Sequence, residues 1–265
     1  MEKEILIFGH KNPDTDSICS AMVKERLNKK NGYDSSVAVR LGNINKETQY
    51  VLNYLNLEAP ELKEEVAEGQ KVIMVDHNEF NQSIKGIEKA KILGVVDHHR
   101  IANFETSDPL YYTARPYGCT STILFQDFKG KGIEINREEA ILMASAIISD
   151  TLLLKSPTTT KHDEKALEEL EKIAGIDIKE YGLEMLKAGT DLDDFTAKEL
   201  INLDAKELDK NGIKFVIGQV NTVDIPSVLE RQEELEKAIE EELKEKELAL
   251  FVLAITDILN SNSEI

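Results

Sequence analysis

The chain has 265 residues, of which 41% are hydrophobic and 31% carry a charge, and this length allows one or two domains with proper hydrophobic cores. Its 32 Lys and Arg against 50 Asp and Glu give a net charge of −18, which argues against a broad nucleic-acid-binding surface. The sequence has neither a membrane-spanning apolar run nor a secretory signal, and its two cysteines fit no disulfide or zinc-finger spacing. We therefore expect a soluble, cytoplasmic protein.

The first hundred residues alternate short apolar runs with amphipathic stretches. Strands are predicted at Glu4–Gly9, Ser36–Leu41, Lys71–Asp76 and Ile92–Asp97, and helices at Asp16–Lys30, Glu47–Leu57 and Ile84–Ala90. Strands that alternate with helices indicate βαβ units, so we predict an α/β fold with a mainly parallel, five-stranded type of sheet and flanking helices. Ligands of such sheets bind beyond the carboxyl ends of the strands, and in this chain polar residues follow those ends.

The second half of the chain indicates four more helices and then a second domain. The helices are predicted at Thr120–Phe128, Arg137–Ser149, Asp163–Ala174 and Ile178–Lys187. Residues 189–194 are small and acidic and form the best linker candidate, which predicts a first domain over residues 1–188 and a smaller α/β domain over 195–265. In the smaller domain, helices are expected at Phe195–Leu208 and Val228–Glu247, and strands at Lys214–Val220 and Leu248–Thr256. A turn at residues 260–263 leaves too few residues for a partner strand, which we interpret as a C-terminal truncation.

The turn after the first strand, GHKNPDTDS at residues 9–17, carries three potential metal ligands, His10, Asp14 and Asp16. A turn stiffened by its proline can direct three such side chains to one point, whereas a straight strand would splay them. Alternatively, Asp16 or Ser17 simply caps the following helix. Capping explains neither His10 nor Asp14, so we favour metal binding.

Two further polar segments, DHNE at residues 76–79 and DHHR at residues 97–100, follow apolar strands. Asp76 ends a buried strand, where a carboxylate is costly unless it is paired or coordinated; the alternative is a helix N-cap. His77 would point the other way in an extended chain and is interpreted as a supporting or surface residue. The adjacent His98 and His99 can share one site only if the chain turns there, and the alternative is a pair of hydrogen-bonded core histidines.

A fourth candidate, Asp150, ends a predicted helix, where the partial negative charge of the helix C-terminus disfavours a carboxylate unless a cation lies nearby. The complete ligand set is His10, Asp14, Asp16, Asp76, His98 and Asp150. Two imidazoles and four carboxylates exceed the needs of one ion and suit two ions about 3.5–4 Å apart, bridged by a carboxylate and a water. Mixed nitrogen and oxygen ligands favour Mn²⁺, Co²⁺, Zn²⁺ or Fe²⁺ over Mg²⁺, and without a cysteine ligand we choose Mn²⁺, with Co²⁺ next.

These segments, in this order, resemble the DHH phosphoesterase superfamily and, more narrowly, the manganese-dependent (family II) inorganic pyrophosphatases. The resemblance covers essentially the whole chain. It implies that His10, Asp14 and Asp76 hold one ion, and that Asp16, Asp76, His98 and Asp150 hold the other, with Asp76 as the bridge. It also implies that His99 contacts the substrate, that Lys206 binds phosphate, and that the chain forms a homodimer through its first domain.

The activity that this resemblance implies is hydrolysis of inorganic pyrophosphate by a metal-bridging hydroxide, with Mg²⁺ accompanying the substrate and with no nucleic-acid or membrane partner. Family members carry a basic Ser-Arg-Lys-Lys-Gln segment that these residues lack, so we expect weakened substrate binding. A rival reading is a DHH-type phosphodiesterase acting on short oligonucleotides or cyclic dinucleotides, which the absence of a Gly-Gly pair and of Trp disfavours. A regulatory sensor module would require lost ligands, and all six are present.

Overall fold

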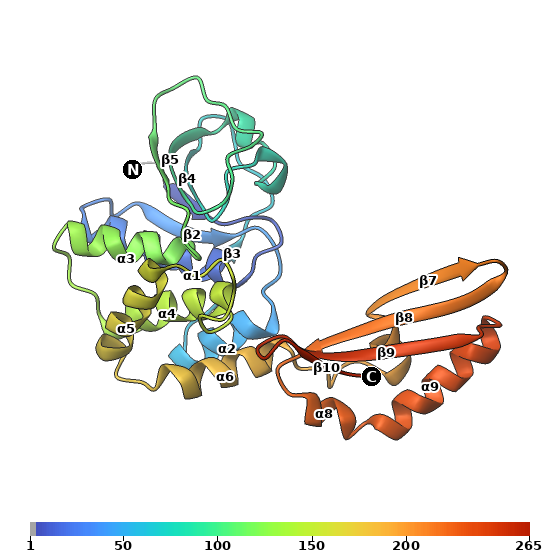
Figure 1. Cartoon of the computed structure of the whole chain (residues 1–265). Helices are drawn as coiled ribbons and strands as arrows, with labels where there is room; N and C mark the ends of the chain where they lie inside the picture. The colour runs from blue at the N-terminus through green and yellow to red at the C-terminus, as the bar shows by residue number, and fades with distance from the viewer. Residues whose placement is uncertain (1–3) are drawn as a thin grey trace. The chain divides into compact units, whose positions relative to one another are not determined.

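The computed structural model describes residues 4–265, which divide into two compact units, one ending at Met185 and one running from Leu186 to Ile265 (Figure 1). The predicted linker at residues 189–194 falls at the start of the second unit and stays a prediction. Among the described residues, no helix is both long enough and apolar enough to cross a membrane.

The first unit is built on a six-stranded sheet, ordered β3-β2-β1-β4-β5-β6, in which every neighbouring pair is parallel. Its strands are β1 (Ile5–Phe8), β2 (Ser36–Arg40), β3 (Glu61–Leu62), β4 (Lys71–Val75), β5 (Lys91–Asp97) and β6 (Tyr111–Ala114). The predicted mainly parallel α/β sheet is confirmed; it has six strands, of which the sequence prediction located four. The edge strands β3 and β6 escape prediction because they are short and carry no buried apolar run.

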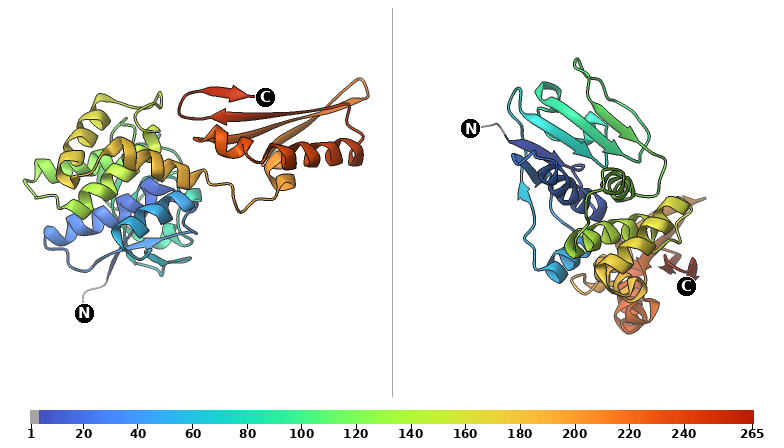
Figure 2. Two further views of the ribbon diagram at one scale, coloured as in Figure 1. Left: turned by 90° about the horizontal axis from the view of Figure 1, so that it is seen from below. Right: turned by 90° about the vertical axis from the view of Figure 1, so that its left-hand side faces the viewer.

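Helices cover one face of this sheet in two layers (Figure 2). They are α1 (Thr15–Lys30), α2 (Lys46–Leu55), α3 (Thr120–Gly130), α4 (Arg137–Thr151), α5 (Lys161–Ala174) and α6 (Ile178–Gly189). In the layer next to the sheet, helix α1 packs on β1, β2 and β4, and α3 packs on β5. In the outer layer, α4 packs on α1 and α3, and α5 packs on α4. The other face buries Leu6, Phe8, Met74 and Val95 in a hydrophobic cluster.

One helix predicted for the first unit, Ile84–Ala90, is wrong. The structure forms only the short 3₁₀ helices η1 (Phe80–Gln82) and η2 (Ile87–Lys89) there. Gly86 has a φ of 86°, a left-handed conformation that interrupts an α-helix. The flanking Ile84 and Ile87 are buried in the cluster described above, so their apolar spacing reflects packing against the sheet.

The second unit has a mixed four-stranded sheet, ordered β10-β9-β8-β7. Its strands are β7 (Asp204–Lys210), β8 (Ile213–Thr222), β9 (Leu250–Asp257) and β10 (Asn262–Glu264), and its helices are α7 (Ala197–Asn202), α8 (Ile225–Leu229) and α9 (Gln232–Glu245). Leu200, Val220, Leu235 and Ile255 form part of its core. The predicted smaller α/β domain is thereby confirmed.

Three details of this second unit differ from the sequence prediction. The helix expected over Phe195–Leu208 ends at Asn202, because Asn211 and Gly212, with φ of 57° and 81°, form a two-residue turn that pairs β7 with β8. The helix expected over Val228–Glu247 is split between α8 and α9, and at the break the guanidinium of Arg231 donates to the carbonyl oxygens of Leu192 and Phe195. The expected lack of a partner for the last strand is wrong, since β10 pairs antiparallel with β9.

Candidate metal centre

The parallel strands β1, β4 and β5 end at one edge of the first unit's sheet, and the segment after β1 brings His10 beside the start of α1. Asp14 is the N-cap of α1, and its Oδ1 accepts the backbone N–H of Ser17 at 2.9 Å. The helix cap predicted as an alternative is therefore Asp14, and not Asp16 or Ser17. The other oxygen of Asp14, Oδ2, lies 3.4 Å from Nε2 of His10, so one carboxylate caps the helix and faces the imidazole.

Asp76 follows β4 and lies between two groups of potential ligands. Its side chain is 1% exposed, with Oδ2 3.5 Å from Nε2 of His10 and Oδ1 3.4 Å from Nε2 of His98. The hydroxyls of Ser17 and Thr120 donate to Oδ2 and Oδ1, at 2.8 and 3.2 Å. The backbone of Asp76 has a φ of 58°, a left-handed conformation that Asp and Asn tolerate better than most residues. This conformation turns the chain at the strand end.

Asp16, in the first turn of α1, is fully buried, and its side chain lies at the N-terminus of α3. Its Oδ2 accepts the backbone N–H of Thr120 at 2.7 Å, and its Oδ1 accepts the N–H of Ser121 at 3.3 Å and the hydroxyl of Ser20 at 2.5 Å. The N-cap residue of α3 makes no side-chain cap of its own. A carboxylate offers about four lone-pair sites, so Asp16 can cap α3 and still offer an oxygen to a cation.

His98 is oriented by the backbone, because its Nδ1 lies 3.0 Å from the carbonyl oxygen of Tyr117. An N–H at Nδ1 donates to that carbonyl and leaves a lone pair on Nε2, as in most metal-binding histidines. Nε2 of His98 is 3.6 Å from Oδ2 of Asp150 at the end of α4. That oxygen is buried and has no hydrogen-bond partner within the described part of the chain, which fits a residue whose partner is a cation.

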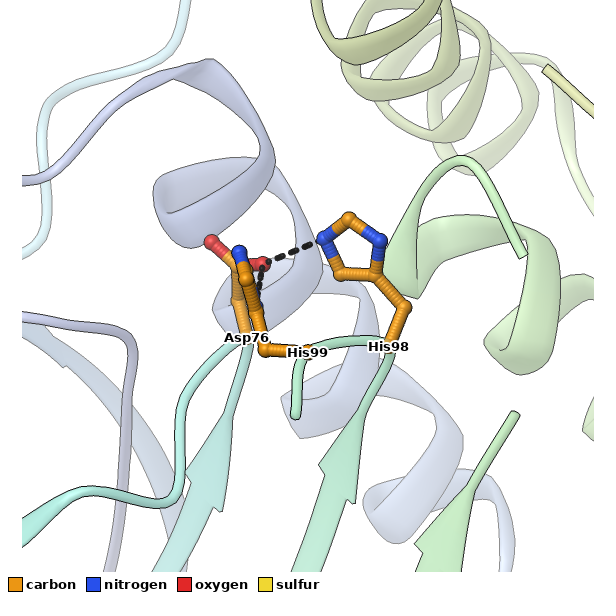
Figure 3. A group of neighbouring side chains, drawn as sticks. All are labelled: Asp76, His98 and His99. Carbon is orange, nitrogen blue, oxygen red and sulfur yellow. Dashed lines mark ion pairs between the residues drawn. The ribbon is translucent and has the colours of Figure 1, made fainter. Parts of the chain in front are cut away.

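His99 lies beside His98, with ring centroids 4.1 Å apart, and the chain turns at the end of β5 so that both rings face Asp76 (Figure 3). Nδ1 of His99 is 3.0 Å from Oδ1 of Asp97, which also accepts the backbone N–H of His99 at 3.1 Å. Half of the His99 side chain is exposed. The buried Asp97 therefore fixes a histidine that remains accessible from solvent.

His77, by contrast, is a buried supporting residue. Its Nδ1 lies 2.9 Å from the carbonyl oxygen of Val75, and its Nε2 lies 3.1 Å from the hydroxyl of Ser83. Burial lowers its pKa to about 4, so the ring is neutral at pH 7. It packs near His10, with ring centroids 6.5 Å apart.

The electrostatics of the cluster favour a bound cation. Burial, reinforced by repulsion from Asp16, raises the pKa of Asp76 and of Asp150 well above the usual range. Two groups have one ligand atom per residue within 4.8 Å of one another, namely His10, Asp14 and Asp76, and Asp16, Asp76, His98 and Asp150. A third group, Asp76, His98 and His99, meets the same criterion. Divalent cations would offset the repulsion among these buried carboxylates, so the residues present fit a pair of such ions that share Asp76.

The structure brings the six predicted ligands and His99 together in the first unit. Lys206 belongs to the second unit, where it is exposed on strand β7 and not on the predicted helix. The sequence prediction assigned no role in the site to the hydrogen-bonding residues Asp97, Ser17 and Thr120. The run of small polar residues at 118–122, before an apolar helix, is the sequence signal that could have indicated a second element at this site.

Comparisons with known proteins agree across both units. Residues 4–147 match the profile of the DHH family, N-terminal domain, and residues 183–265 match the DHHA2 domain. A Bacillus subtilis protein named "Manganese-dependent inorganic pyrophosphatase" is 57% identical over 99% of this chain and 85% of its own length. A Staphylococcus carnosus protein named "Probable manganese-dependent inorganic pyrophosphatase" is 57% identical over 98% of this chain and 84% of its own.

Solved structures show the same fold. A Methanococcus jannaschii structure assigned to the family II inorganic pyrophosphatases superposes with a TM-score of 0.71 at 40% identity, covering 97% of this chain and 85% of that one. An exopolyphosphatase-related protein from Bacteroides fragilis has a TM-score of 0.58 at 14% identity, over 89% of this chain and 68% of its own. At that identity the second likeness concerns the fold alone.

Proposed function

Since this chain belongs to the manganese-dependent inorganic pyrophosphatases of the DHH family, we propose that it binds two Mn²⁺ ions and hydrolyses inorganic pyrophosphate to two phosphates. The observation that carries the proposal is Asp76, a buried carboxylate with one oxygen directed at each of two ligand groups. In this assignment His10 and Asp14 complete one ion site. Asp16, His98 and Asp150 complete the other.

Such ions, when bound, acidify coordinated water and offset charge on the phosphoryl oxygens. The chain's own contribution is to hold the ligands before any ion arrives. Ser17 and Thr120 donate to the two oxygens of Asp76, and the carbonyl of Tyr117 fixes the tautomer of His98. These contacts support a site that needs little rearrangement on metal binding.

His99 is suited to contact the substrate. Its hydrogen bond with Asp97 is the main cause that raises the pKa of His99, which favours the imidazolium near neutral pH. With Nδ1 held by Asp97, Nε2 is the nitrogen that can donate a proton to a phosphoryl oxygen. We propose that His99 positions and protonates pyrophosphate in this way.

Lys206 is proposed to bind phosphate, because a polyanionic substrate of a chain with a net charge of −18 needs local cations. The proposal extends to Co²⁺ as an alternative metal, Mg²⁺ accompanying the substrate, a homodimer, a cytoplasmic location and no binding of nucleic acid. Neither the described residues nor the names of the relatives favour the phosphodiesterase alternative.

The test is phosphate release from pyrophosphate by the Mn²⁺-loaded protein, compared with hydrolysis of a cyclic dinucleotide and of a short oligonucleotide. We expect the protein to hydrolyse pyrophosphate and neither of the two nucleotide substrates, and to contain two Mn²⁺ per chain by elemental analysis. Preferential cleavage of either nucleotide, or no turnover with both ions bound, would refute the proposed substrate.

A further inference from the structure

Two helices that carry proposed metal ligands, α1 and α4, pack against each other, and the contacts at their ends show that they run in opposite directions. Asp14 and Asp16 lie at the N-terminal end of α1, and Asp150 lies at the C-terminal end of α4. At the opposite ends, Nζ of Lys30 on α1 contacts Oε2 of Glu139 on α4 at 2.6 Å. An ion pair thus ties the helices at the end away from the ligands.

At the ligand end, a carboxylate from a third helix ties the same pair together. Oε1 of Glu47, in the first turn of α2, accepts the hydroxyl of Thr15 at 2.5 Å and the hydroxyl of Ser149 at 2.5 Å. Thr15 stands between the two aspartates of α1, and Ser149 immediately precedes Asp150. One oxygen atom therefore joins the neighbours of ligands that come from two different helices.

We propose that Glu47 is a positioning residue, which sets the spacing between Asp16 on α1 and Asp150 on α4 and thereby the affinity of the ion that these two carboxylates share. This inference rests on the proposed two-ion centre. Glu47 contacts neither substrate nor metal in this assignment. It acts through the hydroxyls of Thr15 and Ser149.

The hydrogen bonding of the ligands explains why the position of Asp150 depends on this contact. Oδ2 of Asp150 is buried without a hydrogen-bond partner among the described residues and lies 3.6 Å from Nε2 of His98, so the placement of this oxygen depends largely on the position of α4. Asp16 is held by the N–H groups of α3, and its side chain also interacts with that of Asp150. Contacts of 2.5 Å are typical of hydroxyls bound to a carboxylate, which are about twice as strong as neutral hydrogen bonds.

The two ion sites should respond differently to the loss of Glu47. His10, Asp14 and Asp76 come from the β1–α1 loop, the helix cap and the end of β4, and none of them lies on α4. Loosening α4 against α1 therefore affects the second group, which contains Asp150, and leaves the first group in place. A general loss of stability would not distinguish the two sites in this way.

The experiment measures Mn²⁺ binding by equilibrium dialysis and elemental analysis for wild type, Glu47→Ala, Glu47→Gln and Glu139→Ala, with the melting temperature of each protein in EDTA. We expect Glu47→Ala to weaken one of the two ions about 10–100-fold, the usual effect of removing an outer-shell partner, and to leave the other unchanged. Glu47→Gln should recover most of the affinity, because its amide oxygen can accept both hydroxyls. Glu139→Ala, the matched control, should lower the melting temperature and leave both ions bound.

The inference would be overturned if Glu47→Ala bound each ion with the same affinity as wild type. It would also be overturned if the variant weakened both ions equally. A wild type that binds fewer than two ions would instead overturn the proposed two-ion centre, so the two failures are distinguishable. If Glu47→Ala does not fold, the double variant Thr15→Val with Ser149→Ala removes the two donors and keeps the carboxylate. It should show the same selective loss of one ion, and an unchanged affinity would again refute the role of Glu47.

Discussion

Replacing Asp76 with Asn tests the shared carboxylate directly. The two oxygens of Asp76 face His10 and His98, at 3.5 and 3.4 Å, whereas an amide has one oxygen and one NH₂ group that repels a cation. Asn also tolerates the left-handed backbone that this position has. The variant should therefore keep its fold and lose at least one of two ions.

The expected size of the effect follows from ligand linkage. A free Mn²⁺ concentration of 1,000 times the dissociation constant stabilises a protein by about 4.1 kcal/mol per ion, so two ions that each bind with that ratio contribute about 8 kcal/mol. At about 2–4 °C per kcal/mol for a unit of this size, Mn²⁺ should raise the melting temperature of the wild-type first unit by about 15–30 °C. In Asp76→Asn the rise should be half of that or less, and kcat/KM should fall by about 10²–10³, comparable to the loss of one transition-state charge stabiliser.

Calorimetry with Mn²⁺ and with EDTA, combined with metal analysis after gel filtration, measures both quantities. In EDTA the variant should melt no lower than wild type, because Asn removes a buried charge whose pKa is raised by burial and by repulsion from Asp16. Two Mn²⁺ per chain and the full thermal shift in Asp76→Asn would refute the shared-ligand assignment.

Three further outcomes are expected. His99→Asn should keep two Mn²⁺ per chain and lower turnover about 10²-fold or more, as for loss of a proton donor. His98→Asn should instead lose an ion. If metal analysis finds the lost ion in His99→Asn and two ions in His98→Asn, the two roles are reversed. Lys206→Ala should lower kcat/KM about 10–100-fold, the equivalent of the roughly 1.5–3 kcal/mol of a charge-assisted hydrogen bond, without changing the metal content. Lys210→Ala on the same strand is the control. Equal losses of kcat/KM in the two variants would contradict a specific phosphate contact of Lys206. In the metal-free protein the carboxyl of Asp150, whose raised pKa exceeds its ordinary 3.8, binds more protons folded than unfolded, so its contribution to stability falls as pH rises from about 4 towards neutral, while buried His77 contributes with the opposite sign. Asp150→Asn should therefore gain stability relative to wild type at pH 7.5 compared with pH 5, and urea unfolding in EDTA that shows the same difference between the two proteins at both pH values would contradict this.

The grouping of these candidate ligands in space could be predicted because most of them follow the end of a predicted strand, whereas the signal at Asp150 was weak by itself. Asp76 ends a buried apolar run, and in a parallel sheet such ends meet at one edge. The α/β fold followed from the same alternation of strands and helices. In the structure, Nε2 of His10 and Nε2 of His98 each lie within 3.5 Å of one oxygen of Asp76.

The supporting residues could not be predicted in the same way, because their roles depend on tertiary contacts. Asp16 caps α3 across more than a hundred residues of sequence, and Glu47 reads locally as an ordinary acidic residue of a first helical turn. The strand that carries Lys206 was overlooked because its alternation is charged on both faces. Its only clear signal is the Asn-Gly pair in the following turn.

The left-handed backbone of Asp76 also restricts which residues evolution or a mutational library can place at this position. Glu would keep the carboxylate, but its longer side chain and a φ of 58° would combine backbone strain with displaced oxygens. Gly and Asn would accept the backbone and lack the charge. Position 76 therefore has a single amino acid that satisfies both the conformation and the chemistry, and a saturation library selected for activity should return Asp alone.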